Sequence, residues 1–420
     1  MSRSEFSRPA VLAAIGAWFG FLTGPNVMLA ATNSNFLRVL PDALHTSRTT
    51  ISTALAVSLW ISAILVPIGG RLVDRLGLRR IVLPGIVLFS LVFLLLSQIT
   101  AGWHFVVLQI LMAVPISMHA SPAYAKLISL WFDRNRGLVL GLCVALGAGL
   151  GQTIMPKLIQ ALIDTHGWRG GYLGIAAIVL VVGLPSVALL ARTPKNLAIA
   201  SQAETTAADS VSQASLRLER VGLSRAEALH RREFYQLFIA IMLGSFALLG
   251  TLQHAMPLLT ERGLSVGTAT SVISTAFAGV IAGQSTSGFF VDRINSPRVV
   301  LPYFVAALLG VTAIYTARSP SFLIPGALLM GLGLGGEISQ NAYLVSRYFG
   351  LKAFGAIYGL TFAASAIGSG SGLIVLGFVR DHFGSYMPGR LLMSGAMLGS
   401  VLCIALLPSF TFDSQRAQAR

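Results

Sequence analysis

Long apolar runs separated by short polar segments repeat along the whole chain. A helix needs roughly 20 apolar residues to cross the hydrocarbon core of a bilayer, so runs of this length predict membrane-spanning helices. We predict twelve spans, at about residues 10–31, 49–69, 80–99, 104–127, 137–162, 170–191, 234–258, 267–291, 299–317, 321–346, 354–378 and 388–408. The expected fold is therefore an all-α membrane protein.

One connection is much longer than the others. Residues 192–233 are polar and, up to about residue 215, rich in Ala, Ser, Gln and Thr, which is typical of a flexible linker. Near its end, Ser224 and Glu227 have capping-box spacing, which predicts a short amphipathic helix before the seventh span. The predicted domains are thus an N-terminal six-helix half (1–191), a cytoplasmic linker (192–233) and a C-terminal six-helix half (234–420).

A charged segment, Gly69–Arg80, follows the second span and predicts a tight hairpin before the third. A weaker copy follows the eighth span, which indicates that the chain contains one unit twice. Two pseudo-symmetric six-helix bundles are typical of secondary transporters, whose substrate lies near the midplane between them. Three pairs share an offset of 218 residues: Gly70 and Gly288, Asp74 and Asp292, and Arg75 and Arg293.

Composition agrees with a membrane protein. The 420 residues are 55% hydrophobic and 11% charged, whereas soluble domains carry about 25% charged residues. The two cysteines, Cys143 and Cys403, lie in apolar runs, so no disulfide framework is expected.

The net charge of +15 reflects topology rather than nucleic-acid binding. If both termini are cytoplasmic, 22 of the 30 Lys and Arg residues fall in cytoplasmic segments. This bias follows the positive-inside rule and favours contact with lipid headgroups. We expect an inner-membrane protein whose partners are the bilayer, a small molecule and protons, and which acts as a monomer.

Glu337 is the acidic residue that lies clearly inside a predicted span. An ionisable group in a bilayer is costly and is a functional candidate by default. The offset of 218 makes His119 of the fourth span the repeat equivalent of Glu337 of the tenth. We interpret them as a proton-coupling or substrate-binding pair, since histidine can titrate near neutral pH. The alternative is that each side chain is buried and satisfied locally.

Further polar residues inside the spans complete the predicted substrate or proton site. Asn341 and Gln340 follow Glu337 by about one helical turn. Asn26 follows Gly24-Pro25, a pair that frees a backbone carbonyl inside the first span. The remaining candidates are Gln152, Gln284, Tyr124, Gln253 and His254. Interhelical hydrogen bonding is the alternative role for the glutamines.

The full chain resembles the major facilitator superfamily. Segment Gly69–Arg80 is similar to that family's signature between its second and third helices. Ser129–Gly141 and Ala226–Phe234 resemble the monocarboxylate and oxalate–formate transporter branch. The resemblance implies a secondary carrier of a small organic anion, such as a monocarboxylate, working by alternating access with proton symport. That branch often has a charged residue in the eighth span, and this chain has Gln284 there.

The charged segment suggests a conformational latch. Asp74 could face the positive N-terminal end of a helix from the other half, and Gly70 would let a neighbouring helix approach. Such a latch would favour the outward-open state, and its alternative is a plain positive-inside anchor. The predicted latch residues are Gly70, Asp74, Arg75, Arg79 and Arg80, with Asp292 and Arg293 in the second copy.

Enzyme chemistry finds no support in the sequence. There is no Walker loop for ATP and no Cys/His cluster with metal-ligand spacing, so no cofactor or metal is expected. Two alternatives to anion transport stay open: an efflux carrier for amphipathic compounds, and a non-transporting membrane sensor with the same fold.

Overall fold

The computed structural model describes residues 6–132, 136–193, 222–293, 296–350 and 352–410. Within these ranges the regular elements are helices. In chain order they are α1 (Arg8–Leu22), α2 (Pro25–Met28), α3 (Asn33–Ala43), α4 (Arg48–Leu76), α5 (Leu78–Leu96), α6 (Gly102–Met118), α7 (Ser121–Trp131), α8 (Arg136–Cys143), α9 (Leu150–Ala177), α10 (Leu184–Leu190), α13 (Arg225–Leu229), α14 (Arg232–Gln253), α15 (Ala255–Glu261), α16 (Val266–Arg293), α17 (Leu301–Thr316), α18 (Pro320–Phe349), α19 (Phe354–Phe383) and α20 (Gly389–Ala405). Short π-helical turns at Val144–Gly149 and Ile178–Gly183 and a 3₁₀ turn at Pro297–Val300 complete the series.

The described helices account for the twelve predicted spans. Ten segments are long and apolar enough to cross a membrane, by length and composition. One of them, Val139–Leu190, contains the fifth and sixth spans, which separate at Gly167, where φ is 69°. The twelfth span is the 17-residue apolar helix α20.

The predicted hairpin between the second and third spans was too long. Helix α4 continues through the charged residues to Leu76, because the first residue that breaks it is Gly77. Gly77 adopts φ 89°, a conformation that glycine reaches without steric cost, and α5 begins at the next residue. Most of the predicted latch residues therefore lie on the last turns of a helix.

Three of the described spans are interrupted instead of continuous, and the seventh breaks between α14 and α15 at His254. The first span breaks between α1 and α2 at Thr23 and Gly24, and the fourth breaks between α6 and α7 at His119 and Ala120. Pro25 and Pro122 sit within the first two positions of the new helices, where a missing N–H is tolerated. These breaks expose backbone polar groups inside the membrane, where they need partners.

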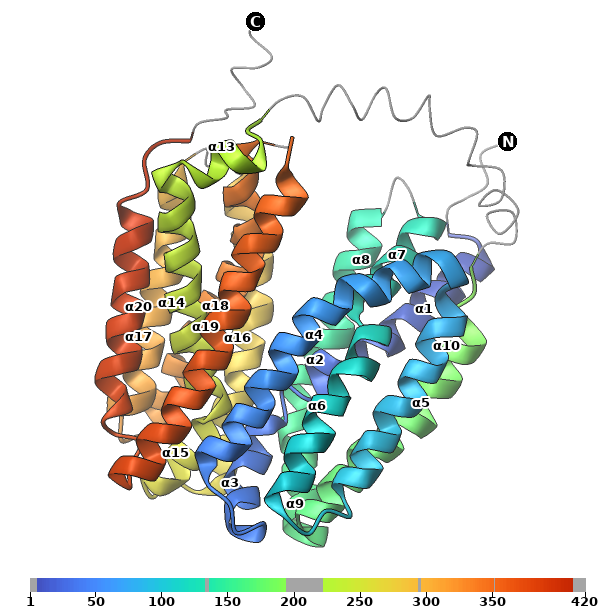
Figure 1. Cartoon of the computed structure of the whole chain (residues 1–420), viewed down its shortest axis with the longest axis vertical. Coiled ribbons are helices and arrows are strands. Elements are labelled where there is room, and N and C mark those ends of the chain that lie inside the picture. The colour runs from blue at the N-terminus through green and yellow to red at the C-terminus, as the bar shows by residue number, and fades with distance from the viewer. Residues whose placement is uncertain (1–5, 133–135, 194–221, 294–295, 351, 411–420) are drawn as a thin grey trace, which may run out of the picture. The chain divides into compact units, whose positions relative to one another are not determined.

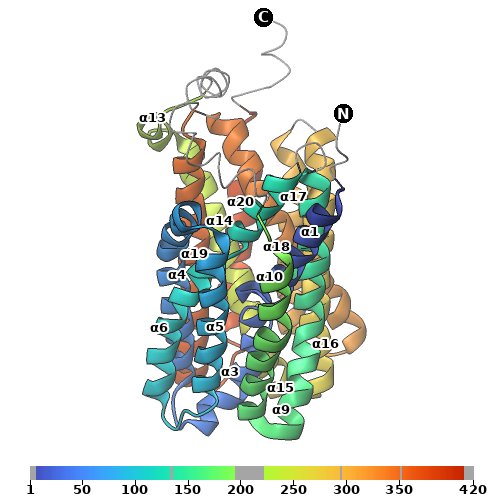
Figure 2. The same cartoon turned by 90° about the vertical axis from the view of Figure 1, so that its right-hand side faces the viewer.

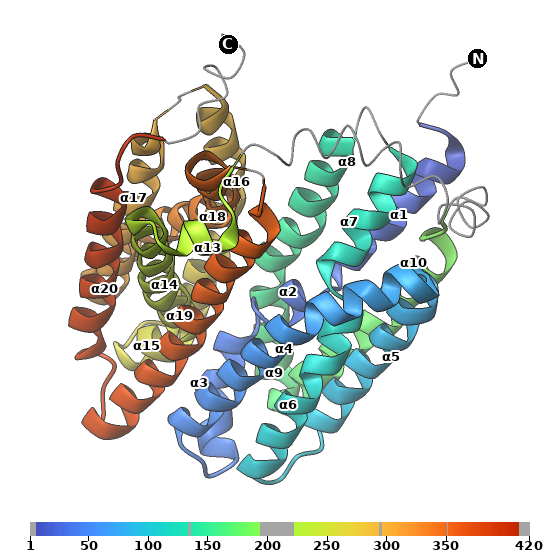
Figure 3. The ribbon, with the colours of Figure 1, turned by 45° about the horizontal axis from the view of Figure 1, so that its top comes forward.

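The chain divides into two compact units. The first unit holds residues 1–198, 252–278 and 373–386, and the second holds residues 199–251, 279–372 and 387–420. In the first unit, α4, α5 and α6 pack side by side (Figures 1 and 2), and α1 packs on α7 and α10. In the second unit, α17 packs between α18 and α20 (Figure 3).

The predicted capping box is present at α13, although most of the predicted linker (194–221) lies outside the described residues. Ser224 N–H donates to Glu227 Oε2 at 2.6 Å, and Glu227 N–H donates to Ser224 Oγ at 3.3 Å. The Ser224 N–H lowers the pKa of the Glu227 carboxyl below its ordinary value, because it hydrogen-bonds the charged form.

Residues ahead of α13 also pair with the end of α18. Gly222 and Gly350 form an antiparallel bridge, and Leu223 N–H donates to Phe349 O at 2.8 Å. Gly350 ends α18 with φ 73°, as expected for a glycine that terminates a helix.

Candidate functional site

Glu337 is buried in the second unit, where only 4% of it is exposed. Its carboxyl oxygen Oε1 accepts a hydrogen bond from Ser245 Oγ on α14. Ser245 Oγ also lies 2.7 Å from Ser365 Oγ on α19. Gly244 makes room for the carboxyl group, since a Cβ there would lie 2.6 Å from Glu337 Oε2. Helices α14, α18 and α19 thus enclose one acid.

The second oxygen of Glu337 has no hydrogen-bond partner among the described residues. Gln340 and Asn341 are buried next to it on α18, and both amide atoms of Gln340 and Oδ1 of Asn341 are also unpartnered there. An unsatisfied buried polar group typically costs about 1–3 kcal/mol. This cluster, Glu337, Gln340 and Asn341, therefore offers hydrogen-bonding groups that a substrate, a water molecule or a proton could satisfy.

His119 lies at the break of the fourth span in the first unit and is fully buried. Its Nε2 atom lies 3.3 Å from Thr23 O, a carbonyl at the break of the first span. Its Nδ1 atom contacts the hydroxyl of Tyr124. With the proton on Nε2, the ring donates to Thr23 O and accepts from Tyr124, so His119 joins the first and fourth spans at their breaks.

Two more predicted residues lie beside these breaks. Asn26 Nδ2 donates to Ser121 Oγ at 3.5 Å, at the start of α7. Gln152 Nε2 on α9 donates to Asn26 O at 3.1 Å. The first unit therefore brings the predicted residues of the first, fourth and fifth spans together in one polar group.

The other predicted site residues are Gln284, Gln253 and His254, and the backbone N of Gln284 would lie 2.9 Å from a Cβ at Gly335 of α18. Gln284 is half-buried on α16, in the second unit. Gln253 Nε2 donates to Ala30 O at 3.2 Å, and His254 contacts Ser52, Tyr386 and Leu373 O, all in the first unit. His119 belongs to the first unit and Glu337 to the second, so their pairing stays a prediction.

The predicted latch is partly described. The side chains of Asp74 and Asp292 lie outside the described part of the structure. Arg75 and Arg80 are exposed, Arg79 is half-buried, and Arg293 lies over the Phe289 ring of its own helix, 3.5 Å from the centroid.

The close approach predicted for Gly70 stays a prediction. A Cβ at Gly70 would meet no described atom within 4 Å, whereas one at Gly69 would overlap Ser117 O on α6. Because residues along a helix turn by about 100° each, only one of two neighbouring glycines faces the packed helix.

Sequence reasoning missed Ser245, which donates to Glu337, and Ser365, which contacts Ser245. Ser245 and Ser365 are uncharged and common in membrane helices, so nothing in their sequence marked them. Among the described residues, no group of three or more His, Cys, Asp and Glu side chains could hold a metal ion.

Comparisons with known proteins agree on one family. Residues 10–373 match the sequence model of the Major Facilitator Superfamily. Human monocarboxylate transporter 11 is 27% identical over 422 residues, covering 94% of this chain and 84% of that protein. The gallate transporter of Pseudomonas putida is 24% identical, covering 73% of this chain and 75% of that protein. The crystal structure of the nucleoside transporter NupG matches 95% of this chain and 99% of that chain with a TM-score of 0.71 and 14% identity, which supports the fold alone.

Proposed function

This chain belongs to the Major Facilitator Superfamily and is a multi-pass membrane transporter, and we propose that it moves a small organic anion, a monocarboxylate, together with a proton. Transport proceeds by alternating access across the inner membrane, with both termini in the cytoplasm. The observation that carries this proposal is the buried carboxyl group of Glu337, with one oxygen held by Ser245 and the other without a partner.

A carrier that couples to protons needs an ionisable group that reaches solvent in only part of its cycle. Glu337 fits this role because its burial, its serine contact and the space left by Gly244 keep one acid inside the second unit. The unpartnered amide of Gln340 and the unpartnered Oδ1 of Asn341 provide hydrogen-bonding groups about one turn away. The proposal also rests on relatives whose names describe monocarboxylate and gallate transporters.

The substrate carboxylate would be held by neutral donors in this chain. The polar group at the helix breaks offers Asn26, Ser121 and Gln152, and the N-terminal end of a helix such as α7 attracts negative charge. Gln284 is a further neutral candidate in the second unit.

Uptake into proteoliposomes tests the proposal. Labelled monocarboxylates, including short aliphatic acids and an aromatic hydroxy acid, are offered with and without an inward proton gradient, and the matching amides serve as uncharged controls. We expect accumulation of at least one acid that increases with the gradient. Accumulation of none of them would contradict the anion proposal, and saturable binding without flux would favour a sensor instead.

A further inference from the structure

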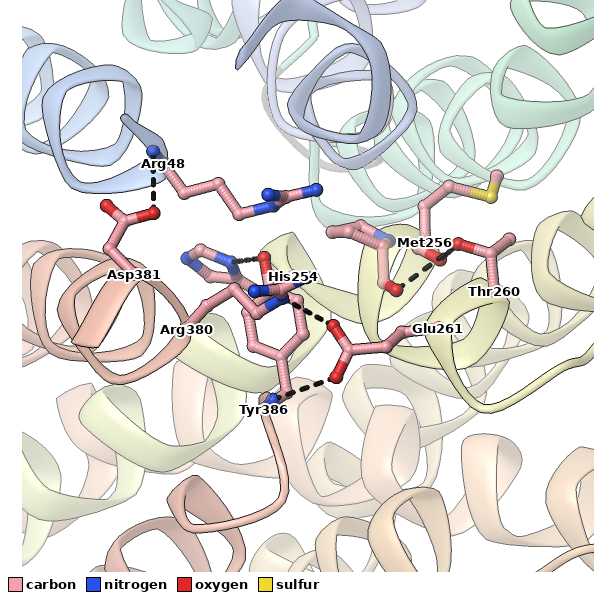
Figure 4. Close-up of polar contacts among 9 residues, drawn as sticks. Arg48, His254, Met256, Thr260, Glu261, Arg380, Asp381 and Tyr386 are labelled. Atoms are coloured by element: carbon pink, nitrogen blue, oxygen red, sulfur yellow. Dashed lines mark hydrogen bonds and ion pairs between the residues drawn. The ribbon is translucent and has the colours of Figure 1, made fainter. Parts of the chain in front are cut away.

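Asp381, near the end of α19, caps the start of α4 (Figure 4). Its carboxylate accepts a hydrogen bond from Arg48 N at 3.2 Å. It also accepts from Thr49 N at 2.7 Å and from Thr49 Oγ1 at 2.6 Å. The first N–H groups of a helix have no partner within the helix, and the positive end of the helix dipole favours an anion there. Ser47 already caps α4 locally by accepting from Thr50 N at 3.0 Å. Helix α4 therefore receives a second cap from a residue more than 300 positions away in the sequence.

A network beside Asp381 joins the two ends of α15 to the last turn of α19 and to the residues after it (Figure 4). Glu261 Oε2 lies 2.5 Å from Arg380 Nε, and Glu261 Oε1 accepts from Tyr386 N at 3.2 Å. The buried hydroxyl of Tyr386 lies 3.2 Å from His254 Nδ1. His254, which caps the start of α15, and Glu261, its last residue, are thus connected to the segment that carries Asp381.

Segments from the two sequence halves meet within this first unit. Met256 N–H donates to Ser34 Oγ at 2.8 Å, which joins α15 to α3. Gly377 allows α19 to approach α4 closely, since a Cβ there would lie 2.9 Å from Ser52 Oγ and 3.1 Å from Arg48 O. Ser52 is buried beneath these contacts. The ends of the spans that are predicted to face outwards are therefore joined by short polar contacts.

We propose that Asp381 is a positioning residue of an outer gate. Its carboxylate holds the start of α4 while the outer side of the transporter is closed, and the hydrogen bonds break when that side opens. This inference rests on the proposed orientation with cytoplasmic termini. Such contacts suit a gate because their donors lie at an exposed position, where water can replace the carboxylate.

Asp164 provides a matched comparison within the same unit. It occupies the corresponding end of the fifth span, but its carboxylate accepts from Gln160 Nε2 of its own helix at 2.7 Å. Neutralising Asp164 should leave the gate unchanged, whereas neutralising Asp381 should loosen it.

Thiol labelling from outside tests the gate. Cys143 and Cys403 are replaced by serine, and Ser52→Cys places a thiol under the gate. Intact cells are then treated with a membrane-impermeant maleimide. Losing a helix cap of this kind should raise the labelling rate of Asp381→Asn by about 2- to 30-fold, and Asp164→Asn should label at the parent rate. Thr49→Val, which removes one of the three donors and keeps the side-chain shape, should give a smaller increase.

Three results would overturn the gate. The first is that Asp381→Asn and Thr49→Val both label at the parent rate. The second is that Asp164→Asn raises the labelling rate as much as Asp381→Asn does. The third is that Asp381→Asn labels faster only in inside-out vesicles, which would show that the contact does not close the outer face. If Asp381→Asn does not fold, Thr49→Val decides the question. The assay needs no substrate, so failed uptake of monocarboxylates would leave its result intact.

Discussion

Glu337 shows how a single residue can combine burial with incomplete hydrogen bonding. Its Oε1 atom is bonded to Ser245 and its Oε2 atom has no partner among the described residues. An acid that served only to connect helices would be expected to use both oxygens, because an unpaired one is costly. The free oxygen is therefore the atom that we assign to proton exchange.

Glu337→Gln should abolish the dependence of uptake on the proton gradient. Glutamine keeps the shape of the side chain and can still accept the Ser245 hydrogen bond, but it cannot release a proton near neutral pH. Substrate exchange without a gradient should persist. Uptake is measured in proteoliposomes over a range of pH.

Glu233→Gln is the matched control, since Glu233 lies at the start of α14 and away from this cluster. It should retain the parent pH profile. A Glu337→Gln protein whose pH profile equals that of the parent would remove Glu337 from proton coupling.

The sequence identified part of this site. Glu337 and His119 could be found because ionisable residues are rare in apolar runs. Ser245, which donates to Glu337, and its neighbour Ser365 could not be found, because they resemble serines that bond only their own helix, as Ser369 does with Ser365 O. Which serine faces the acid depends on how the helices pack.

At the scale of the element, glycine decides how closely helices approach. On α19, a Cβ at Gly368 would overlap Met242 O of α14, and one at Gly372 would overlap Phe246 O. Gly355 and Gly359 have the same four-residue spacing on the same helix, but a Cβ at either would meet no described atom within 4 Å. The spacing alone predicts helix packing, and the three-dimensional arrangement determines which glycines take part.

Gly368→Ala should destabilise the protein by about 1–3 kcal/mol, because the added methyl group forces α14 and α19 apart. Gly359→Ala adds the same methyl group into open space and should have a much smaller effect. Thermal unfolding of the detergent-solubilised variants measures both. Equal melting temperatures for the two variants would contradict the close packing of α14 and α19.

Helix ends were the least predictable part of the elements. The second span was predicted to end at about residue 69, before the charged residues of segment Gly69–Arg80, yet α4 continues to Leu76. Charged residues at a membrane surface do not break a helix, and only Gly77 supplies the backbone conformation that ends it.

At the scale of the whole molecule, two acids are proposed to act on opposite faces of the membrane. Asp74 is predicted to favour the outward-open state, and Asp381 is proposed to hold the outer side closed. Both proposals invoke the same physical interaction, a carboxylate at the positive end of a helix.

Asp74→Asn should therefore slow the labelling of Ser52→Cys from outside, whereas Asp381→Asn should accelerate it. Loss of the predicted latch removes stabilisation from the outward-open state, so the thiol is exposed for less time. The same maleimide assay gives both rates, and Asp164→Asn again serves as the neutralised-acid control. Faster labelling of Asp74→Asn would show that the latch acts in the opposite sense.

The chain repeat could be found in the sequence because pairs such as Asp74 and Asp292 keep a constant offset. The contacts of Asp381 could not, because its partner Thr49 lies 332 positions away and neither residue stands out in composition. Long-range capping has no local sequence pattern, unlike the capping box at Ser224.

The pairing of Gly222 and Leu223 with the end of α18 determines where the chain can be divided if it is expressed as two separate fragments. These backbone contacts make Gly222 and Leu223 structural members of the second unit, although they precede α14 in the sequence. A two-plasmid version of the protein should therefore begin its second fragment before Gly222. A fragment that started at α14 would lack both α13 and the strand-like contact that covers the last carbonyl groups of α18.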